Sequence, residues 1–176
     1  MHRKVRVYSE EAGLPVLRLL FAGALALLLA LPARAGDLPE EPSEAAMTFA
    51  AGFAQDQLSG MLSRIGARQP QMMALGQMDG STLAAVFDAE IARAVEKHGA
   101  AWQRNMAIAW TPLMTEDELN SLTAEGADSP HVDKYLGLRD QAGQNMQTLS
   151  GDLFREILEE VMQNTINELA PVESTQ

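Results

Sequence analysis

The sequence predicts an all-α protein, a single compact bundle of about four to six amphipathic helices behind a cleavable signal peptide. Within residues 36–176, Ala and Leu together number 34 against 10 for Val and Ile, which favours helices over strands. Apolar residues recur every three or four positions along several segments, and no segment shows the sustained alternation of a half-buried strand. These 141 residues are the size of one domain, so we expect one core.

Residues 1–35 are predicted to be a secretory signal peptide. Arg18 is the last of four basic residues that precede an uninterrupted apolar run, Leu19 to Leu31. The run has 13 residues, whereas a membrane-crossing helix needs ~20, so a cleaved leader is favoured over a permanent anchor. Small residues at Ala33 and Ala35 suit a signal peptidase. The mature chain is therefore expected in the periplasm, with an extracellular location as the alternative.

The charge balance argues against nucleic acid as a partner. The chain has 13 Lys and Arg against 24 Asp and Glu. Removal of the signal peptide leaves 8 against 22, a formal charge of −14. Such a chain repels polyanions and anionic lipid, whereas a basic partner fits it electrostatically. The chain has no Cys, which excludes disulfides, thiolate zinc sites and thiol catalysis.

The mature chain is expected to divide into an extended acidic leader over 36–42, a helical domain over 43–170 and a polar tail over 171–176. Ser43 is expected to cap the first helix, because its hydroxyl can accept from a backbone N–H of the first turn. The apolar spacing predicts that this helix runs over about 44–67 and ends before the next proline.

The start of the second helical region is not marked by apolar spacing. Residues 69–80 lack a clear period, so we expect a loop that leads into an N-cap at Ser81. Helical spacing then continues over about 82–110. Lys97-His98-Gly99 resembles a helix C-terminus, yet the apolar stripe continues in phase through it. One long helix with a weak point at Gly99 and two shorter helices are both compatible with this pattern.

Two further helix starts are predicted from local motifs. Thr115 and Glu118 have the spacing of a capping box, in which each side chain accepts from the other residue's backbone N–H. Ser129 followed by Pro130 predicts an N-cap with proline at the first helical position. A final long helix is expected from about residue 141.

The run Thr115-Glu116-Asp117-Glu118-Leu119, followed about ten residues later by Ser129-Pro130, is similar to a bacterial family of small exported helical proteins. This domain-of-unknown-function family has a pattern of roughly T-x-x-E-L and then S-P-x-G, and the resemblance covers about residues 81–165. The chain departs from this pattern at two places. Residues 125–128 stand where the family has an aromatic pair, and Val132 stands where the family has a small residue. The resemblance implies an exported helical fold and no catalytic residue.

The sequence shows no constellation typical of an enzyme. His98 and His131 are the histidines of the mature chain. His98 has carboxylates in its helical neighbourhood, but a histidine there is more often a boundary residue than a catalytic one. Nucleophile-elbow, Walker, dinucleotide-binding and EF-hand patterns are absent from the sequence. We therefore expect neither catalysis nor a cofactor.

The methionines provide the candidate metal ligands. Met72, Met73 and Met78 fall within the expected loop, and thioethers suit Cu(I). The competing interpretations are core packing and an adaptable contact surface. Trp102 and Trp110 lie about two turns apart, so they can share a face of the helix. We expect them to anchor the core, and an exposed recognition strip is the alternative.

The sequence therefore predicts a soluble exported protein that acts as a non-catalytic binding or interaction module. Its expected partner is an envelope protein or another extracytoplasmic component. The alternative is a periplasmic protein that binds a small molecule or Cu(I) through the Met-rich segment. Self-association is compatible with long amphipathic helices, which often bury apolar faces in pairs.

Overall fold

The computed structural model describes residues 38–169, which fold almost entirely as helices. The α-helices are α2 (Glu44–Ala51), α3 (Ala54–Gly66), α4 (Pro70–Trp110), α5 (Glu116–Glu125) and α6 (Val132–Leu169), with a short 3-10 helix η1 (Gly126–Asp128) after α5. This part of the chain contains no strand, so the all-α prediction is confirmed. The predicted signal peptide, its cleavage site and the polar tail lie outside the described residues.

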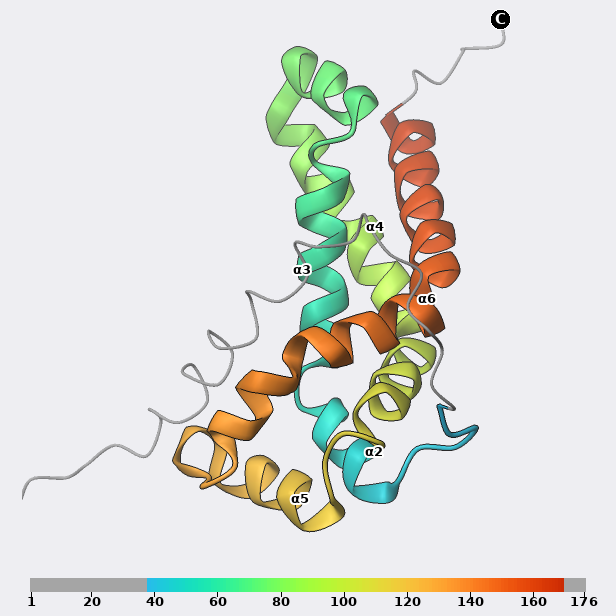
Figure 1. Ribbon diagram of the computed structural model, residues 1–176. Coiled ribbons are helices and arrows are strands. Elements are labelled where there is room, and N and C mark those ends of the chain that lie inside the picture. The colour runs from blue at the N-terminus through green and yellow to red at the C-terminus, as the bar shows by residue number, and fades with distance from the viewer. Residues whose placement is uncertain (1–37, 170–176) are drawn as a thin grey trace, which may run out of the picture.

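The two long helices, α4 and α6, form the frame of the molecule. Figure 1 shows that α4 runs along most of the length of the molecule. The C-terminal part of α6 lies beside it. α3 packs against α4, so α3, α4 and α6 make a three-helix layer at one end. α2 and α5 pack together at the other end, with α2 also against α4.

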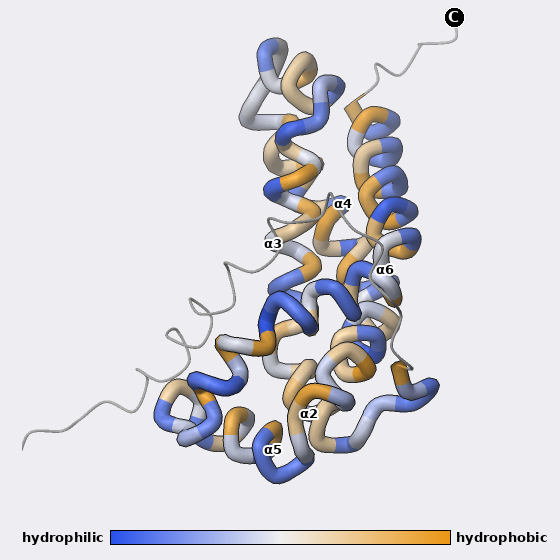
Figure 2. Tube along the Cα trace, viewed as in Figure 1, coloured by the Kyte–Doolittle hydropathy of each residue, from blue (hydrophilic) through white to orange (hydrophobic). Residues whose placement is uncertain are grey.

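The core runs through both ends of the bundle. Phe49, Trp110 and Tyr135 meet where α2, α4 and α6 converge, and the Trp110 and Tyr135 rings stack with centroids 4.9 Å apart. Trp102 and Trp110 are only 3% and 4% exposed, so they are core anchors and the recognition strip is wrong. Figure 2 shows hydrophilic residues of α6 on its outer side and apolar residues on the side that faces α4.

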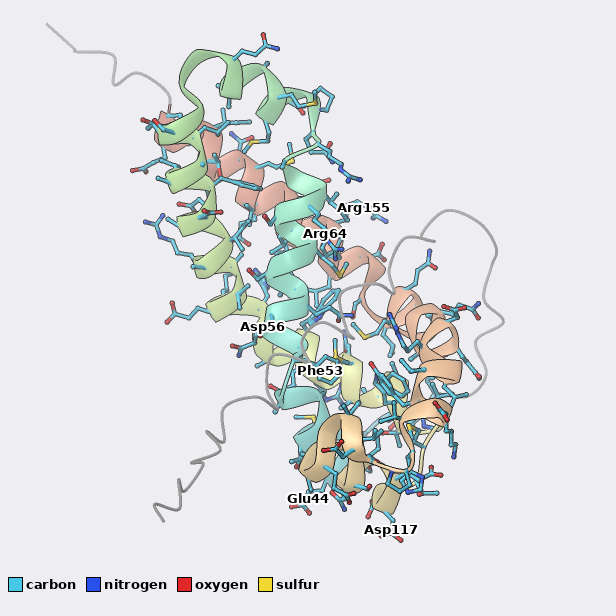
Figure 3. All side chains as sticks on the ribbon, turned by 90° about the vertical axis from the view of Figure 1, so that its left-hand side faces the viewer. Glu44, Phe53, Asp56, Arg64, Asp117 and Arg155 are labelled. Carbon is cyan, nitrogen blue, oxygen red and sulfur yellow. The ribbon has the colours of Figure 1, made fainter. Side chains whose placement is uncertain are left out.

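The first predicted helix, over 44–67, is two helices in the structure. The break falls at Gly52 and Phe53, and Phe53 has a non-helical backbone with φ −152° and ψ −8°. Figure 3 shows Phe53 at the junction of α2 and α3. Gly52 is a poor helix former, and Phe53 is buried edge-on against Phe49 with ring centroids 5.1 Å apart. Packing of Phe53 therefore stabilises a break that the apolar period does not show.

The predicted loop over 69–80 and the predicted N-cap at Ser81 are both wrong. α4 begins at Pro70, so Ser81 lies inside a continuous helix. Proline suits the first helical position because it lacks an N–H that would be unpaired there. Met72 and Leu83 are buried on this stretch, and that burial outweighs the ~1 kcal/mol that an interior glycine costs.

The open question at Gly99 is resolved in favour of one helix, since α4 continues through it. A Cβ at Gly99 would lie 3.3 Å from the side chain of Gln55. The glycine therefore permits close approach of α3 to α4 and does not mark a helix end.

The local caps are mostly as predicted. Ser43 Oγ accepts from Ala46 N at 3.2 Å. Both hydrogen bonds of the capping box form, from Glu118 N to Thr115 Oγ1 at 3.3 Å and from Thr115 N to Glu118 Oε2 at 2.9 Å.

The predicted start at Ser129 and Pro130 comes two to three residues early, because the last helix begins at Val132. Ser129 Oγ accepts from His131 N at 3.2 Å, so its hydroxyl stabilises the turn that enters α6 instead of its first helical turn.

α6 continues through residue 141, where the sequence predicts the start of a separate helix. The helix has no interior proline, so nothing in its backbone forces an end. Figure 1 shows that it changes direction, with a first stretch that crosses α3 and a second that runs beside α4. Gly143, Ser150 and Gly151 lie in its interior, and helices bend most readily at residues of these types.

Candidate functional site

A pocket of about 70 Å³ lies between α3, α4 and α6. The lining residues are Gln57 and Met61 of α3, Trp102 of α4, and Gly143, Met146, Gln147, Ser150, Gly151 and Phe154 of α6. Counted from Gly143, the other α6 residues stand at +3, +4, +7, +8 and +11, a helical spacing that places all six on one face of the helix. Gly143 and Gly151 bring no side chain to that face, so a space is left beside the larger neighbours.

Two buried polar atoms of this pocket have no hydrogen-bond partner among the described residues, Gln57 Oε1 and Trp102 Nε1. The Trp102 ring packs on Phe154 with centroids 6.0 Å apart, which holds the indole in place. A buried polar atom without a partner costs ~1–3 kcal/mol, and native structures contain few of them. One of these atoms is a donor and the other an acceptor, and they line the same pocket.

Hydrogen bonds between α4 and α6 fix the walls of the pocket. Asn105 Nδ2 donates to Ser150 Oγ at 2.9 Å and to the Leu149 carbonyl at 3.2 Å. Asn145 Nδ2 donates to the carbonyl of Ala109 at 3.0 Å. This carbonyl lies in the last turn of α4, where helices leave carbonyls unpaired. Each long helix thus supplies one amide that binds the other.

His98 belongs to a separate polar cluster on the same helix pair. Glu160 Oε1 accepts from Lys97 Nζ at 2.8 Å, and Glu160 Oε2 lies 3.0 Å from His98 Nε2. The hydrogen bond from Lys97, and after it the one with His98, lowers the pKa of Glu160 below its ordinary value. The partner of His98 is therefore on α6, 62 residues away, and not among the carboxylates of its own helix.

Buried Glu90 extends this cluster along α4. Its carboxylate binds Arg93 and accepts from Asn164 Nδ2 of α6 at 3.2 Å. Glu90 is 4% exposed, so these partners compensate for the burial of its charge. The whole cluster is an inter-helix tie.

His131 lies at the other end of the molecule, beside the capping box. Its Nδ1 is 3.9 Å from Glu118 Oε1, and Lys134 Nζ is 2.6 Å from Glu118 Oε2. The hydrogen bond from Lys134, followed by the one from the Thr115 backbone, lowers the pKa of Glu118. Glu118 thus caps α5 and also links it to α6.

The predicted methionine ligands lie on α4 and not in a loop. Met72 is 3% exposed and packs in the core, whereas Met73 is 59% exposed. Consecutive helical residues project about 100° apart, so the helix does not bring these two sulfur atoms to one side. The side chain of Met78 lies outside what the structure describes. Binding of Cu(I) stays a prediction.

The described part of the chain offers neither a metal centre of acidic or histidine ligands nor a membrane-spanning helix. There, His, Asp and Glu form no group of three or more arranged to hold a metal ion. Among the helices of residues 38–169, none combines the length and the apolar character that a membrane span requires.

Comparison with protein-family models, curated proteins and solved structures finds no match to this chain. The resemblance to the exported helical family therefore stays a prediction. The pocket stands as the candidate site on its own geometry. The sequence predicted that Trp102 lies in the core but did not single out Gln57. The role of Gln57 depends on its neighbour in the pocket, Trp102, which lies 45 residues further along the chain.

Proposed function

We propose that this chain is a non-catalytic binding module that takes a small ligand, or the end of a larger one, into the pocket between α3, α4 and α6. The observation that carries this proposal is the pair of unpartnered buried atoms, Gln57 Oε1 and Trp102 Nε1, on one pocket. A polar group of a ligand would remove a penalty that the folded chain otherwise bears.

The histidines support binding over catalysis. Activated nucleophiles are recognised by a hydrogen bond to a neighbouring base. Among the described residues, His98 pairs with the carboxylate of Glu160 and with no hydroxyl that it could activate, and His131 lies beside the Glu118 capping box. Neither histidine lines the pocket.

We further propose that the module works in the periplasm. The support is the sequence itself, in which basic residues precede the apolar run Leu19–Leu31 and small residues follow at Ala33 and Ala35. The mass of the protein isolated from a periplasmic extract should correspond to a chain that begins at Gly36. Recovery of the uncleaved chain from the cytosol would contradict this proposal.

An envelope protein is the alternative partner. The excess of 24 acidic over 13 basic residues favours a partner with a basic surface, because opposite potentials attract and steer association. Binding of this kind would weaken as salt is added, whereas binding of an uncharged ligand in the pocket would not. The salt dependence of any observed binding therefore distinguishes the two.

A matched pair of glycine substitutions tests the pocket. Gly151 lines it and Gly60 does not, yet a Cβ at either position meets no atom within 4 Å. Both lie inside helices, so leucine at either position should be tolerated by the fold. We expect Gly151→Leu to abolish binding of fragment-sized compounds that raise the melting temperature of the wild type.

Gly60→Leu should leave that binding unchanged. Equal binding by both variants would place the ligand elsewhere, and the absence of any stabilising compound would contradict the proposed function.

A further inference from the structure

We infer that the group bound in this pocket is uncharged and carries both a hydrogen-bond acceptor and a donor, as an aliphatic alcohol or a primary amide does. The inference rests on the proposed binding function and names the chemistry of its ligand. Three properties of the pocket lead to it: the two unpartnered atoms, the absence of charge from its lining, and its size.

The two unpartnered atoms require different things of a ligand. The indole N–H of Trp102 can only donate, and Oε1 of Gln57 can only accept. A carboxylate accepts but does not donate, so it would leave Gln57 Oε1 unpaired. An ammonium donates but does not accept, so it would leave Trp102 Nε1 unpaired. A hydroxyl or a primary amide does both and leaves neither atom without a partner.

The lining also disfavours an ion. None of the residues that line the pocket is Asp, Glu, Lys, Arg or His. An ion buried there would lose its hydration without gaining an opposite charge, which disfavours its binding. The nearest charges along α6 are Asp152 and Arg155, which pair with each other at 2.9 Å and are 96% and 67% exposed. Figure 3 shows Arg155 at the outer surface of the helix.

The size of the pocket limits the buried part of the ligand. A cavity of ~150 Å³ binds benzene with its six non-hydrogen atoms, so about 70 Å³ accommodates roughly three. Met61 and Met146 border the pocket, and their flexible thioether side chains adapt to an aliphatic group. The ligand is thus a short-chain alcohol or amide, or a longer molecule that inserts such an end.

The inference is tested with four-carbon probes that differ only in the polar group: 1-butanol, butyramide, butyrate, butylammonium and methyl propyl ether. Binding is followed by the NMR shift of the Trp102 indole N–H in the full chain, with the resonance assigned from Trp102→Phe. We expect butanol and butyramide to shift this resonance to saturation. Butyrate, butylammonium and the ether, which lacks a donor, should bind at least tenfold more weakly.

Gln57→Met provides the matched variant, since it removes the acceptor and keeps the length of the side chain. This variant should bind butanol only as weakly as the wild type binds the ether, and its binding of the ether should be unchanged. Its helical circular dichroism should stay intact. If the ether or the ions bind as well as butanol, the inference about the ligand is wrong while the binding function stands. If no probe shifts the indole resonance, the pocket holds water only and the proposed function fails with the inference.

Discussion

His98 of α4 lies 3.0 Å from Glu160 of α6, measured from Nε2 to Oε2. Lys97, the residue before it, donates to the other oxygen of the same carboxylate at 2.8 Å. One glutamate thus binds two consecutive residues of the facing helix and fixes the register between α4 and α6. The contact is 13% exposed on the His98 side and 29% exposed on the Glu160 side, so solvent screens it only in part.

The first prediction concerns the pH dependence of this tie. The pKa of Glu160 in the folded protein lies below its ordinary value of 4.5, first because of Lys97. A carboxylate with a lowered pKa stabilises the fold above its unfolded pKa, and this stabilisation disappears as pH falls through the folded pKa. Glu160→Gln should therefore lower the free energy of unfolding by about 0.5–1 kcal/mol at pH 7.

The difference between wild type and Glu160→Gln should shrink as the pH falls below about 4.5, as measured by urea denaturation at a series of pH values. Glu159→Gln changes the exposed neighbour of Glu160 and serves as the control. A difference that stays constant down to pH 3 would show that Glu160 acts through packing and not through its charge.

The second prediction concerns the stability of the pocket itself. Gln57→Met removes a buried acceptor that has no partner, so it should raise the free energy of unfolding of the ligand-free protein by about 1 kcal/mol. Gln103→Met is the contrasting variant, because Gln103 Nε2 donates to the Met47 carbonyl at 3.3 Å. That variant should be neutral or destabilising in the same denaturation experiment. A loss of stability in Gln57→Met would mean that the acceptor has a partner in solution.

The third prediction concerns Gly66 at the end of α3. A Cβ there would lie 2.5 Å from Cζ of Phe87, a buried side chain of α4. Gly66→Ala should therefore lower the free energy of unfolding by about 1–3 kcal/mol, since Phe87 must move within a packed core. Gly60→Ala, on the same helix and with open space at its Cβ, should raise it by about 0.5–1 kcal/mol. Thermal unfolding of the two variants measures both effects, and equal effects would contradict the close contact.

Helix caps were predictable from the sequence, because the two residues that form each capping hydrogen bond lie within one helical turn. The Thr115–Glu118 capping box and the Ser43 cap are of this kind, and both form. Whether a glycine lies at a helix break or inside a helix was not predictable in the same way. Gly52 lies at a break between helices while Gly99 lies inside one, and the difference comes from what packs against each position. For Gly52 it is the burial of Phe53, and for Gly99 it is the approach of α3.

The pocket could be predicted only in part. The sequence indicated that Trp102 is buried, as it is. That its N–H lacks a partner depends on which residues α6 presents to it, and Gly151 lies 49 positions further along the chain. No spacing rule connects positions so far apart, because their contact is set by the path of the whole chain and not by the period of a single helix.

The fourth prediction concerns the amide that holds α6 to α4 beside the pocket. Asn105 Nδ2 donates to Ser150 Oγ, and Ser150 is only 1% exposed. Asn105→Ala removes this bond and the one to the Leu149 carbonyl, so it should lower the free energy of unfolding by about 1–3 kcal/mol. Ser150→Ala should cost less, because only one of these bonds ends on its hydroxyl.

A double-mutant cycle measures the link between the two residues. If the hydroxyl and the amide stabilise each other, the double variant should cost less than the sum of the single variants by about 0.5 kcal/mol or more. Additive costs would show that Asn105 acts through the Leu149 carbonyl alone. Ser150 also lines the pocket, whereas Asn105 does not. Asn105→Ala should therefore weaken ligand binding indirectly, because the wall that Ser150 forms is held less firmly.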